Sequence, residues 1–448
     1  MKVARLLAFL FAASSIAWAQ EPFAAPLVAV AQHRHPQPGA KGLTLAELEA
    51  AALENNPEIR LLAQRVGVAQ AGVGAAGALE DPSVTYRGWG VPLREPWNFN
   101  QPQHMFMVTQ PFPGPGKRAL RAQVAAQGID VAKAEVEAKK REVTAKVRMA
   151  FYELLRNQEE LRLHDEQVAL ARQAFEAARI KYTVGRVPQQ DVLKAQIAFS
   201  KLVDHLAMLE QAGQLARTRL NTLLGRDPAT PLEVAGEHAV PGRLPPLTDL
   251  ERIALQNRPE LLAASVAIRQ GETIAELAGK AYTPDFALGA GYMLMPAGSR
   301  FRNTYMAEFS FSLPWLNRRK HESEIAEAKA EVRALGAAYE SQRAVVLQQI
   351  QEARIRAEVA KKLVELYRDT LRPQAQTTLK AAAAAYQTDR TDFLNLLDSQ
   401  NTALEVEYAY FRALSEYERQ LADLERAIGA PLPTDATPSK EQPRKEVR

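Results

Sequence analysis

The stretch YTVGRVPQQDVLKAQ, from Tyr182 to Gln196, returns in altered form as YQTDRTDFLNLLDSQ, from Tyr386 to Gln400. Both versions begin with Tyr, carry Arg four residues later, have Leu at the twelfth position and end with Gln. The two copies lie 204 positions apart. They indicate that this chain contains the same structural unit twice.

Other matches occur in the same order and with nearly the same spacing. Asn-Asn-Pro-Glu at 55–58 returns as Asn-Arg-Pro-Glu at 257–260, an offset of 202 residues. Chance similarities would not stay in order with offsets confined to the range from 201 to 204. We therefore interpret residues 43–231 and 247–433 as two tandem repeats of one unit.

Each repeat is predicted to open with a helix, to continue with two strands and to end in a long helical hairpin. The opening helix covers residues 45–79 and 247–281, and Thr44 and Glu47 have the spacing of a capping box. The strands are expected at 83–89, 104–112, 286–294 and 304–313. The chain is therefore mainly α, with a small β part in each repeat.

The last of these strands shows the clearest alternation. Tyr305, Phe309 and Phe311 fall on one face, whereas Thr304 and Glu308 fall on the other. Strands of about ten residues with one apolar face are typical of outer-membrane barrels. Four such strands cannot close a barrel, and an open edge in lipid leaves backbone groups unpaired. The strands therefore form either a small soluble sheet or a barrel shared among several copies.

The two hairpins are predicted from long stretches without helix-breaking residues. No proline occurs between Pro115 and Pro188, and this stretch is rich in good helix formers. The chain is expected to turn near 185–188 and near 389–391, and Pro373 predicts a kink in the second outgoing helix. Helices of roughly 100 Å cannot be buried in one globular core, so they need coiled-coil neighbours.

The two ends of the chain are predicted to lie outside the repeats. Residues 1–19 have the pattern of a secretory signal peptide, with a short apolar stretch and Ala-Trp-Ala before the cleavage site. Residues 20–42 are rich in proline and predict a flexible segment. Residues 434–448 are charged and predict a disordered tail.

Composition and motifs exclude several classes of function. The chain has no cysteine, and its 56 basic residues barely exceed its 52 acidic residues, so disulfides, thiolate chemistry and a nucleic-acid partner are not expected. Gly-x-Gly-x-x-Gly at 72–77 follows a helical pattern rather than a strand. Gly-Pro-Gly-Lys-Arg at 114–118 lacks the first glycine and the Ser or Thr of a P-loop. We therefore predict a protein that is not an enzyme and needs no cofactor.

The tandem repeat, the motifs at 55–58 and 257–260 and the two quoted turns resemble the TolC-type outer-membrane efflux factors, over about residues 43–433. The resemblance implies a homotrimer whose twelve-stranded barrel lies in the outer membrane of a Gram-negative bacterium and continues as a helical tunnel across the periplasm. It also implies a passive duct that contacts outer-membrane lipid, a periplasmic adaptor (membrane fusion) protein and an inner-membrane pump of the RND type. The strand count by itself also permits a dimer or a tetramer.

The resemblance places the adaptor and the tunnel entrance at the two turns. The residues implied in docking the adaptor are Tyr182, Gly185, Arg186, Val187, Asp191, Leu193, Asp389, Leu394 and Leu397. The residues implied at the gated entrance are Tyr386, Arg390, Asn395 and Asp398. Tyr386 and Arg390 resemble family residues that tether the second hairpin to its neighbour, and Asp191 is the partner expected for them. Asp398 matches an acidic entrance position, whereas Asn395 replaces another.

The substrate is the least specified part of the prediction. The stretch at 110–123 resembles the heavy-metal resistance branch of the family and implies that the substrates are metal cations. The alternative substrates are drugs or other small organic molecules. The alternative to a duct is a periplasmic coiled-coil scaffold without a pore. His33 and His35 lie in the flexible segment and could bind a divalent metal only weakly. Several methionines lie on or beside the predicted strands. Their thioethers could bind soft Cu(I), but the interpretation that they simply fill strand positions is favoured. These methionines are Met105, Met107, Met293, Met295 and Met306.

Overall fold

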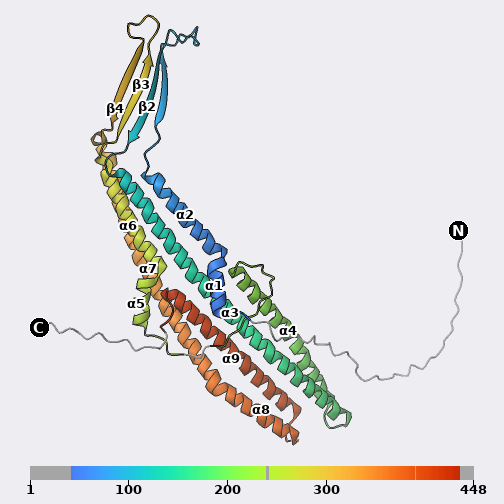
Figure 1. The fold of residues 1–448 in the computed structure, drawn as a ribbon. Coiled ribbons are helices and arrows are strands. Elements are labelled where there is room, and N and C mark those ends of the chain that lie inside the picture. The colour runs from blue at the N-terminus through green and yellow to red at the C-terminus, as the bar shows by residue number, and fades with distance from the viewer. Residues whose placement is uncertain (1–41, 239–241, 389, 434–448) are drawn as a thin grey trace, which may run out of the picture. The chain divides into compact units, whose positions relative to one another are not determined.

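The computed structural model describes residues 42–238, 242–388 and 390–433, which belong to one compact unit (Figure 1). The signal peptide, nearly all of the flexible segment and the tail that the sequence predicts lie outside the described residues. The elements of the first repeat are α1 (Leu45–Asn55), α2 (Pro57–Gly77), β1 (Ser83–Trp89), β2 (Gln103–Phe112), α3 (Lys117–Thr183) and α4 (Gln189–Leu223).

The second repeat follows the same order. Its elements are α5 (Leu247–Asn257), α6 (Pro259–Gly279), a 3-10 turn (Lys280–Tyr282), β3 (Phe286–Leu294), β4 (Asn303–Phe311), a 3-10 turn (Pro314–Asn317), α7 (Arg318–Leu366), a π-helical turn (Tyr367–Leu371), α8 (Arg372–Gln387) and α9 (Phe393–Ile428). None of the helices in the described ranges is both long enough and apolar enough to cross a membrane.

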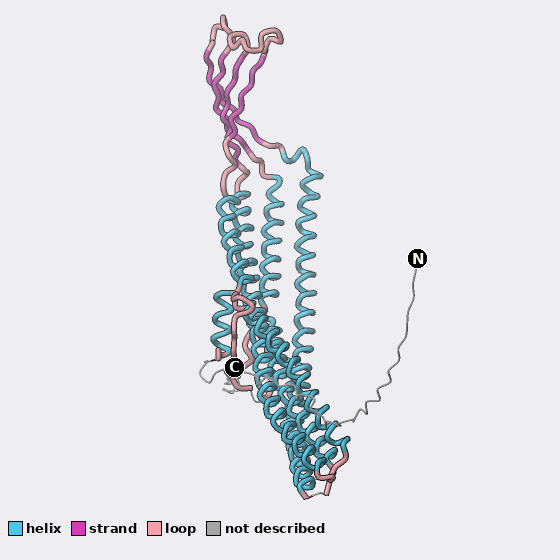
Figure 2. Tube along the Cα trace, turned by 90° about the vertical axis from the view of Figure 1, so that its right-hand side faces the viewer, coloured by secondary structure: helices cyan, strands magenta, loops and turns pink. Residues whose placement is uncertain are grey.

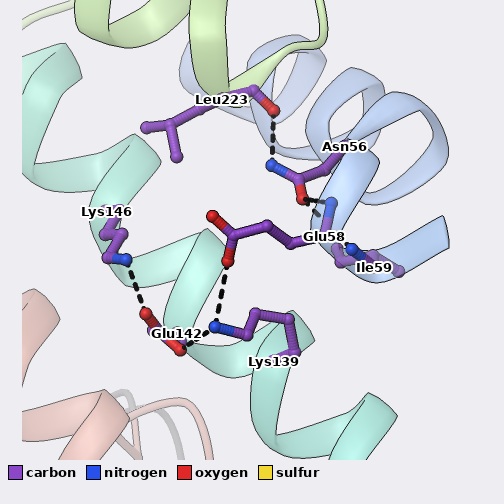
Figure 3. Close-up of polar contacts among 7 residues, drawn as sticks. All are labelled: Asn56, Glu58, Ile59, Lys139, Glu142, Lys146 and Leu223. Carbon is purple, nitrogen blue, oxygen red and sulfur yellow. Dashed lines mark hydrogen bonds and ion pairs between the residues drawn. The ribbon is translucent and has the colours of Figure 1, made fainter. Parts of the chain in front are cut away.

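The opening helix of each repeat is two helices, which corrects the sequence prediction of one. Asn56 stands before Pro57, and a residue before proline is disfavoured in the α conformation, so the chain turns extended there. The Asn56 side chain then caps α2 by accepting hydrogen bonds from the backbone N–H groups of Glu58 (2.9 Å) and Ile59 (3.2 Å). Figure 3 shows this cap, and the second repeat breaks in the same way at Arg258.

The four strands form one antiparallel sheet in the order β1-β2-β3-β4, so the two repeats share it. At its centre, Phe106 of β2 lies opposite Tyr292 of β3, and Met105 lies opposite Met293. Among the described strands, β1 and β4 each have a neighbour on one side only, which leaves two open edges. The sheet extends beyond the helices, and no described helix lies along it (Figure 1).

The two faces of the sheet differ in exposure as well as in chemistry. On one face, Val84, Tyr305 and Phe309 are 76%, 87% and 63% exposed. On the other face, Met107 is only 5% exposed and Glu308 is half-buried. Since no described helix covers this second face, its side chains must cover one another, as on the inside of a curved sheet. We call the two faces the convex face and the concave face.

Each repeat has its own apolar core where its opening helices meet its long helices. In the first repeat, Leu48, Leu154 and Leu220 are fully buried. Leu250 and Ile350 are buried in the same way in the second. From these two cores the hairpins run to the end opposite the sheet, where both turns lie (Figures 1 and 2).

Candidate functional site: the hairpin tips

The first turn is closed by a Schellman motif at the end of α3. Gly185 has a φ of +72°, in the left-handed region that favours glycine. The N–H of Arg186 donates to the Lys181 carbonyl (2.9 Å) and that of Gly185 donates to the Tyr182 carbonyl (2.9 Å). The left-handed backbone of the first turn therefore favours the glycine at position 185.

The second turn repeats this hydrogen-bond pattern at the end of α8. The N–H of Arg390 donates to the Ala385 carbonyl over 2.8 Å, as Arg186 does in the first turn. Asp392 then caps α9, because its carboxylate accepts the N–H of Asn395 (3.0 Å). Asp389, which the sequence places in the docking set, lies outside the described residues.

The two hairpins touch each other directly behind the turns. Ala178 of α3 and Ala195 of α4 are almost completely buried (1% and 3% exposed), and Tyr386 and Leu397 of the second hairpin pack against them. Small residues let the two hairpins approach closely. Leu397, which the sequence places in the docking set, is half-buried and takes part in this contact between the hairpins.

The charged contact between the hairpins differs from the one expected. Among the described residues, no ion pair joins Asp191 to Arg390. The ammonium of Lys181 instead lies 3.9 Å from the centre of the Tyr386 ring, a cation–π contact between α3 and α8. Lys181 is not among the residues that the sequence predicts at the tips, although it stands immediately before the repeated motif that begins at Tyr182.

Most other predicted tip residues are accessible to a partner. The exposed ones are Tyr182, Gly185, Arg186, Leu193, Arg390, Asn395 and Asp398. Val187, Asp191 and Leu394 are half-buried. The tips therefore present polar and apolar side chains on a compact surface whose backbone is fixed by the two closed turns.

A groove of 560 Å³ between α4 and α9 begins at the tips. It is lined by Lys194, Leu397, His205, Tyr408 and Arg412, among others. Burial lowers the pKa of His205 below its ordinary value of 6.5, so this side chain is neutral at neutral pH. The groove therefore offers aromatic rings together with charged side chains of both signs, such as Arg412 and Glu405.

A buried ion pair stands next to this groove. Glu160 of α3 is 2% exposed and accepts a hydrogen bond from Arg156 (3.0 Å), while Arg412 of α9 lies 3.5 Å away. A buried carboxylate needs such partners, because an unpaired charge in the interior is costly. The pair of Glu160 with Arg412 joins α3 to α9 and helps to hold the two hairpins together above the tips.

At the other end of the hairpins, the turn from sheet to helix is fixed by Asp285. Its carboxylate accepts hydrogen bonds from the Lys117 ammonium (2.8 Å) and from the Gly114 N–H (2.6 Å). Arg118 donates twice to the carbonyl of Gly77, at 2.9 and 2.7 Å. The Pro-Gly-Lys-Arg turn thus ties the start of α3 to the residue before β3 through Lys117 and to the end of α2 through Arg118. In the described ranges, no group of three or more His, Asp or Glu residues is placed to hold a metal ion.

A shared four-stranded sheet joined to two long helical hairpins is the protomer architecture of a TolC-type outer-membrane channel. The family model "Outer membrane efflux protein" matches residues 48–226 and 250–430, so the chain belongs to that family. The solved structure of CusC has a TM-score of 0.73 and 15% identity, with 90% of this chain and 96% of that chain covered. This likeness confirms the predicted fold class.

Two relatives of known name are also similar over much of the chain. The cobalt-zinc-cadmium resistance protein CzcC of Cupriavidus metallidurans is 21% identical over 94% of this chain and 98% of its own length. Nodulation protein T of Rhizobium leguminosarum bv. trifolii is 22% identical over 68% of this chain and 67% of its own length. The family model and the similarity to CzcC support the predicted family and its heavy-metal branch, and the structural neighbours are channels rather than enzymes.

Proposed function

We propose that the chain is the outer-membrane exit duct of a tripartite efflux system for heavy-metal cations, assembled as a homotrimer. The observation that carries the proposal is the sheet, which combines two open edges with an apolar convex face. A single copy cannot satisfy its edges in lipid, where each unpaired backbone group costs several kcal/mol. Three copies would join β1 and β4 edge to edge into twelve strands, with the convex face toward lipid.

The hairpin tips are the proposed docking site of a periplasmic adaptor. A trimer would display six tips in a ring, each with a rigid turn and exposed side chains such as Tyr182 and Arg186. The groove between α4 and α9 opens beside them and offers a place for an adaptor segment. An inner-membrane pump, for which we propose the RND type, would supply the energy, because the duct itself is passive.

The same tips are the proposed gate. Tyr386 and Leu397 hold the second hairpin against the first, and Lys181 adds a cation–π contact. Individually such contacts contribute about 0.5–1 kcal/mol at partly exposed sites, so their sum over a trimer suits a closed state that a bound adaptor can open. Asp398 and Asn395 are exposed at the start of α9, next to the second turn, where they would line the entrance.

The proposed cargo is a heavy-metal cation because the cobalt-zinc-cadmium resistance protein is similar over nearly the whole chain. The test is a deletion strain complemented with the gene and challenged with cobalt, zinc, cadmium, copper, silver and several drugs. We expect resistance to at least one metal to depend on the gene. Protection against drugs alone would contradict the metal assignment and leave the duct intact.

The barrel is tested separately by one charge on each face of the sheet. Phe309→Arg places a cation on the convex face, where it should cost about 2–4 kcal/mol near the bilayer midplane. Glu308→Arg, its neighbour on the concave face, is the matched control and should assemble. Equal recovery of heat-modifiable oligomer from outer membranes for both variants would refute the assignment of the convex face to lipid.

A further inference from the structure

Half of the eight methionines of the chain lie on one face of the sheet. Met105, Met107, Met293 and Met306 all belong to the concave face, because directly paired residues and alternate residues of one strand share a face, whereas adjacent residues do not. The convex face carries no methionine at any described strand position. A side chain that merely fills apolar strand positions would serve equally well on the lipid side, so simple filling does not explain this one-sided distribution.

The register brings these side chains together in two pairs. Met105 and Met293 stand directly opposite each other, which places their Cβ atoms about 5 Å apart. Met107 and Met306 flank Gly291 from the two sides. A Cβ built on that glycine would lie 3.4 Å from Met107 Cβ and 3.1 Å from Met306 Cγ, so both side chains border the space that the glycine leaves open.

A second glycine shows where the Met107 sulfur lies. A Cβ built on Gly289 would stand 3.5 Å from Met107 Sδ and 3.1 Å from Thr109 Oγ1. It would also stand 3.3 Å from Cβ of Glu308, the one carboxylate side chain on the described strands. The thioether therefore lies beside a hydroxyl and a negatively charged side chain. In the pair of Met105 and Met293, the side-chain amide of Gln103 donates a hydrogen bond to Met293 Sδ. The side chains of Gln103 and Met293 both lie on the concave face.

The chemistry of this set selects one class of ion. Thioethers are soft, neutral ligands that suit Cu(I), whereas borderline divalent cations prefer imidazole and carboxylate. We propose that the concave face holds a thioether site for soft monovalent cations, Cu(I) or Ag(I), formed by Met105, Met107, Met293 and Met306. The location of this site on the lumen wall rests on the proposed function. In the barrel, an exported soft cation would bind the site transiently on its way out.

The direct test is binding of Ag⁺, used because it has no competing oxidation state, to the purified full-length chain in a nitrate buffer. We expect the wild type to bind Ag⁺ and a variant with all four residues changed to Leu to bind at least tenfold more weakly. Leu conserves the side-chain volume, so the sheet should survive. The matched control is Met149→Leu with Met208→Leu, which changes two methionines of α3 and α4 and should bind like the wild type.

Two further measurements keep the proposal testable if the fourfold variant does not fold. The two pairs are changed separately, as Met105→Leu with Met293→Leu and as Met107→Leu with Met306→Leu, and each should weaken binding. X-ray absorption at the silver edge on the wild type should show sulfur neighbours. Binding through oxygen and nitrogen alone, or equal binding by the strand and control variants, would overturn the site.

Growth assays separate this site from the duct. We expect the fourfold variant to lose silver and copper resistance while zinc and cadmium resistance stay unchanged. If the fourfold variant loses Ag⁺ binding but keeps silver resistance, the site has no role in transport. If the wild type binds Ag⁺ through sulfur but the gene protects against no metal, the site stands and the proposed cargo fails.

Discussion

The two hairpins have the same plan, but only the first is continuous. α3 runs for 67 residues without interruption. Its counterpart ends as α7 at Leu366, passes through the π-helical turn Tyr367–Leu371 and resumes as α8 before Pro373. The return helices α4 and α9 are almost equal, with 35 and 36 residues. The difference in continuity between the two hairpins is therefore confined to the outgoing helix.

The offset between matching residues of the two repeats also changes along the outgoing helices. The offset is 201 residues from Pro113 to Pro314, at the start of the outgoing helices, and 204 from Tyr182 to Tyr386, at their ends. A π-helical turn has i→i+5 hydrogen bonds and takes up about one extra residue in a helix, so it accounts for part of this change in offset. The second hairpin thus contains a wide turn close to Pro373, where the sequence predicted a kink, and the first hairpin has none within the described residues.

The largest contrast between the hairpins should come from single-residue deletions. Deleting Thr370 removes a residue from the π-helical turn and lets an α-helix form with its phase kept on both sides. Deleting Gln167 from α3 rotates everything beyond it by about 100° and misplaces the contact behind the tips. We expect oligomers to survive the first deletion and to be lost in the second, on gels run without heating. Similar yields from both would contradict this difference between the hairpins.

A smaller contrast is expected where the opening helices dock on the return helices. Arg258, 3% exposed, donates to the Arg426 carbonyl (2.8 Å) at the end of α9, as Asn56 donates to the Leu223 carbonyl (2.9 Å) at the end of α4. Arg258→Ala leaves buried acceptors unsatisfied and should cost about 2–3 kcal/mol. Asn56→Ala should cost about 1–2 kcal/mol, since it also removes a helix cap.

Thermal unfolding in detergent, followed by circular dichroism, measures both losses. Asn56→Asp is the matched control for the first repeat, because it keeps the cap acceptor and loses only the donor to Leu223. We expect the thermal stability of Asn56→Asp to lie between that of the wild type and that of Asn56→Ala. A larger loss of stability from Asn56→Ala than from Arg258→Ala would contradict the expectation that the junction at Arg258 contributes more to stability.

The turns themselves should differ in which residues they tolerate. Gly185→Val forces a β-branched residue into the left-handed region, at roughly 1–2 kcal/mol. The second repeat has Asp389 at the matching position of its sequence, so Gly185→Asn is the control that the turn should accept. We expect Val, but not Asn, to abolish crosslinking to the adaptor while the oligomer still assembles. Full crosslinking with Val would remove this turn from the docking site.

The smallest effect is expected at the contact between the hairpins. Lys181→Met keeps most of the side-chain length but removes the charge over the Tyr386 ring, a contact of about 0.5–1 kcal/mol. Lys181→Arg keeps the cation and serves as control. Single-channel conductance in planar bilayers should rise for Met and stay unchanged for Arg. If both variants conduct like the wild type, the cation–π contact does not restrain the gate.

Much of the fold could be predicted because it is encoded by local patterns. The strands were placed within two residues of their observed ends, since alternation of side chains marks them directly, as at Tyr305 and Phe309. The helix break at Asn56 was missed although Pro57 signals it, because the helical periodicity on both sides outweighed one residue. The tips were located by the repeated motif, but the partner of Tyr386 was not.

The sequence by itself determined the repeat, the order of elements and the positions of the turns, because these depend on residues close together in the chain. Only the tertiary structure decided which distant groups meet. It placed Lys181 on Tyr386, joined Asn56 to the end of α4, and set Met105 beside Met293. Each of these contacts joins residues more than a hundred positions apart, and no local periodicity carries that information.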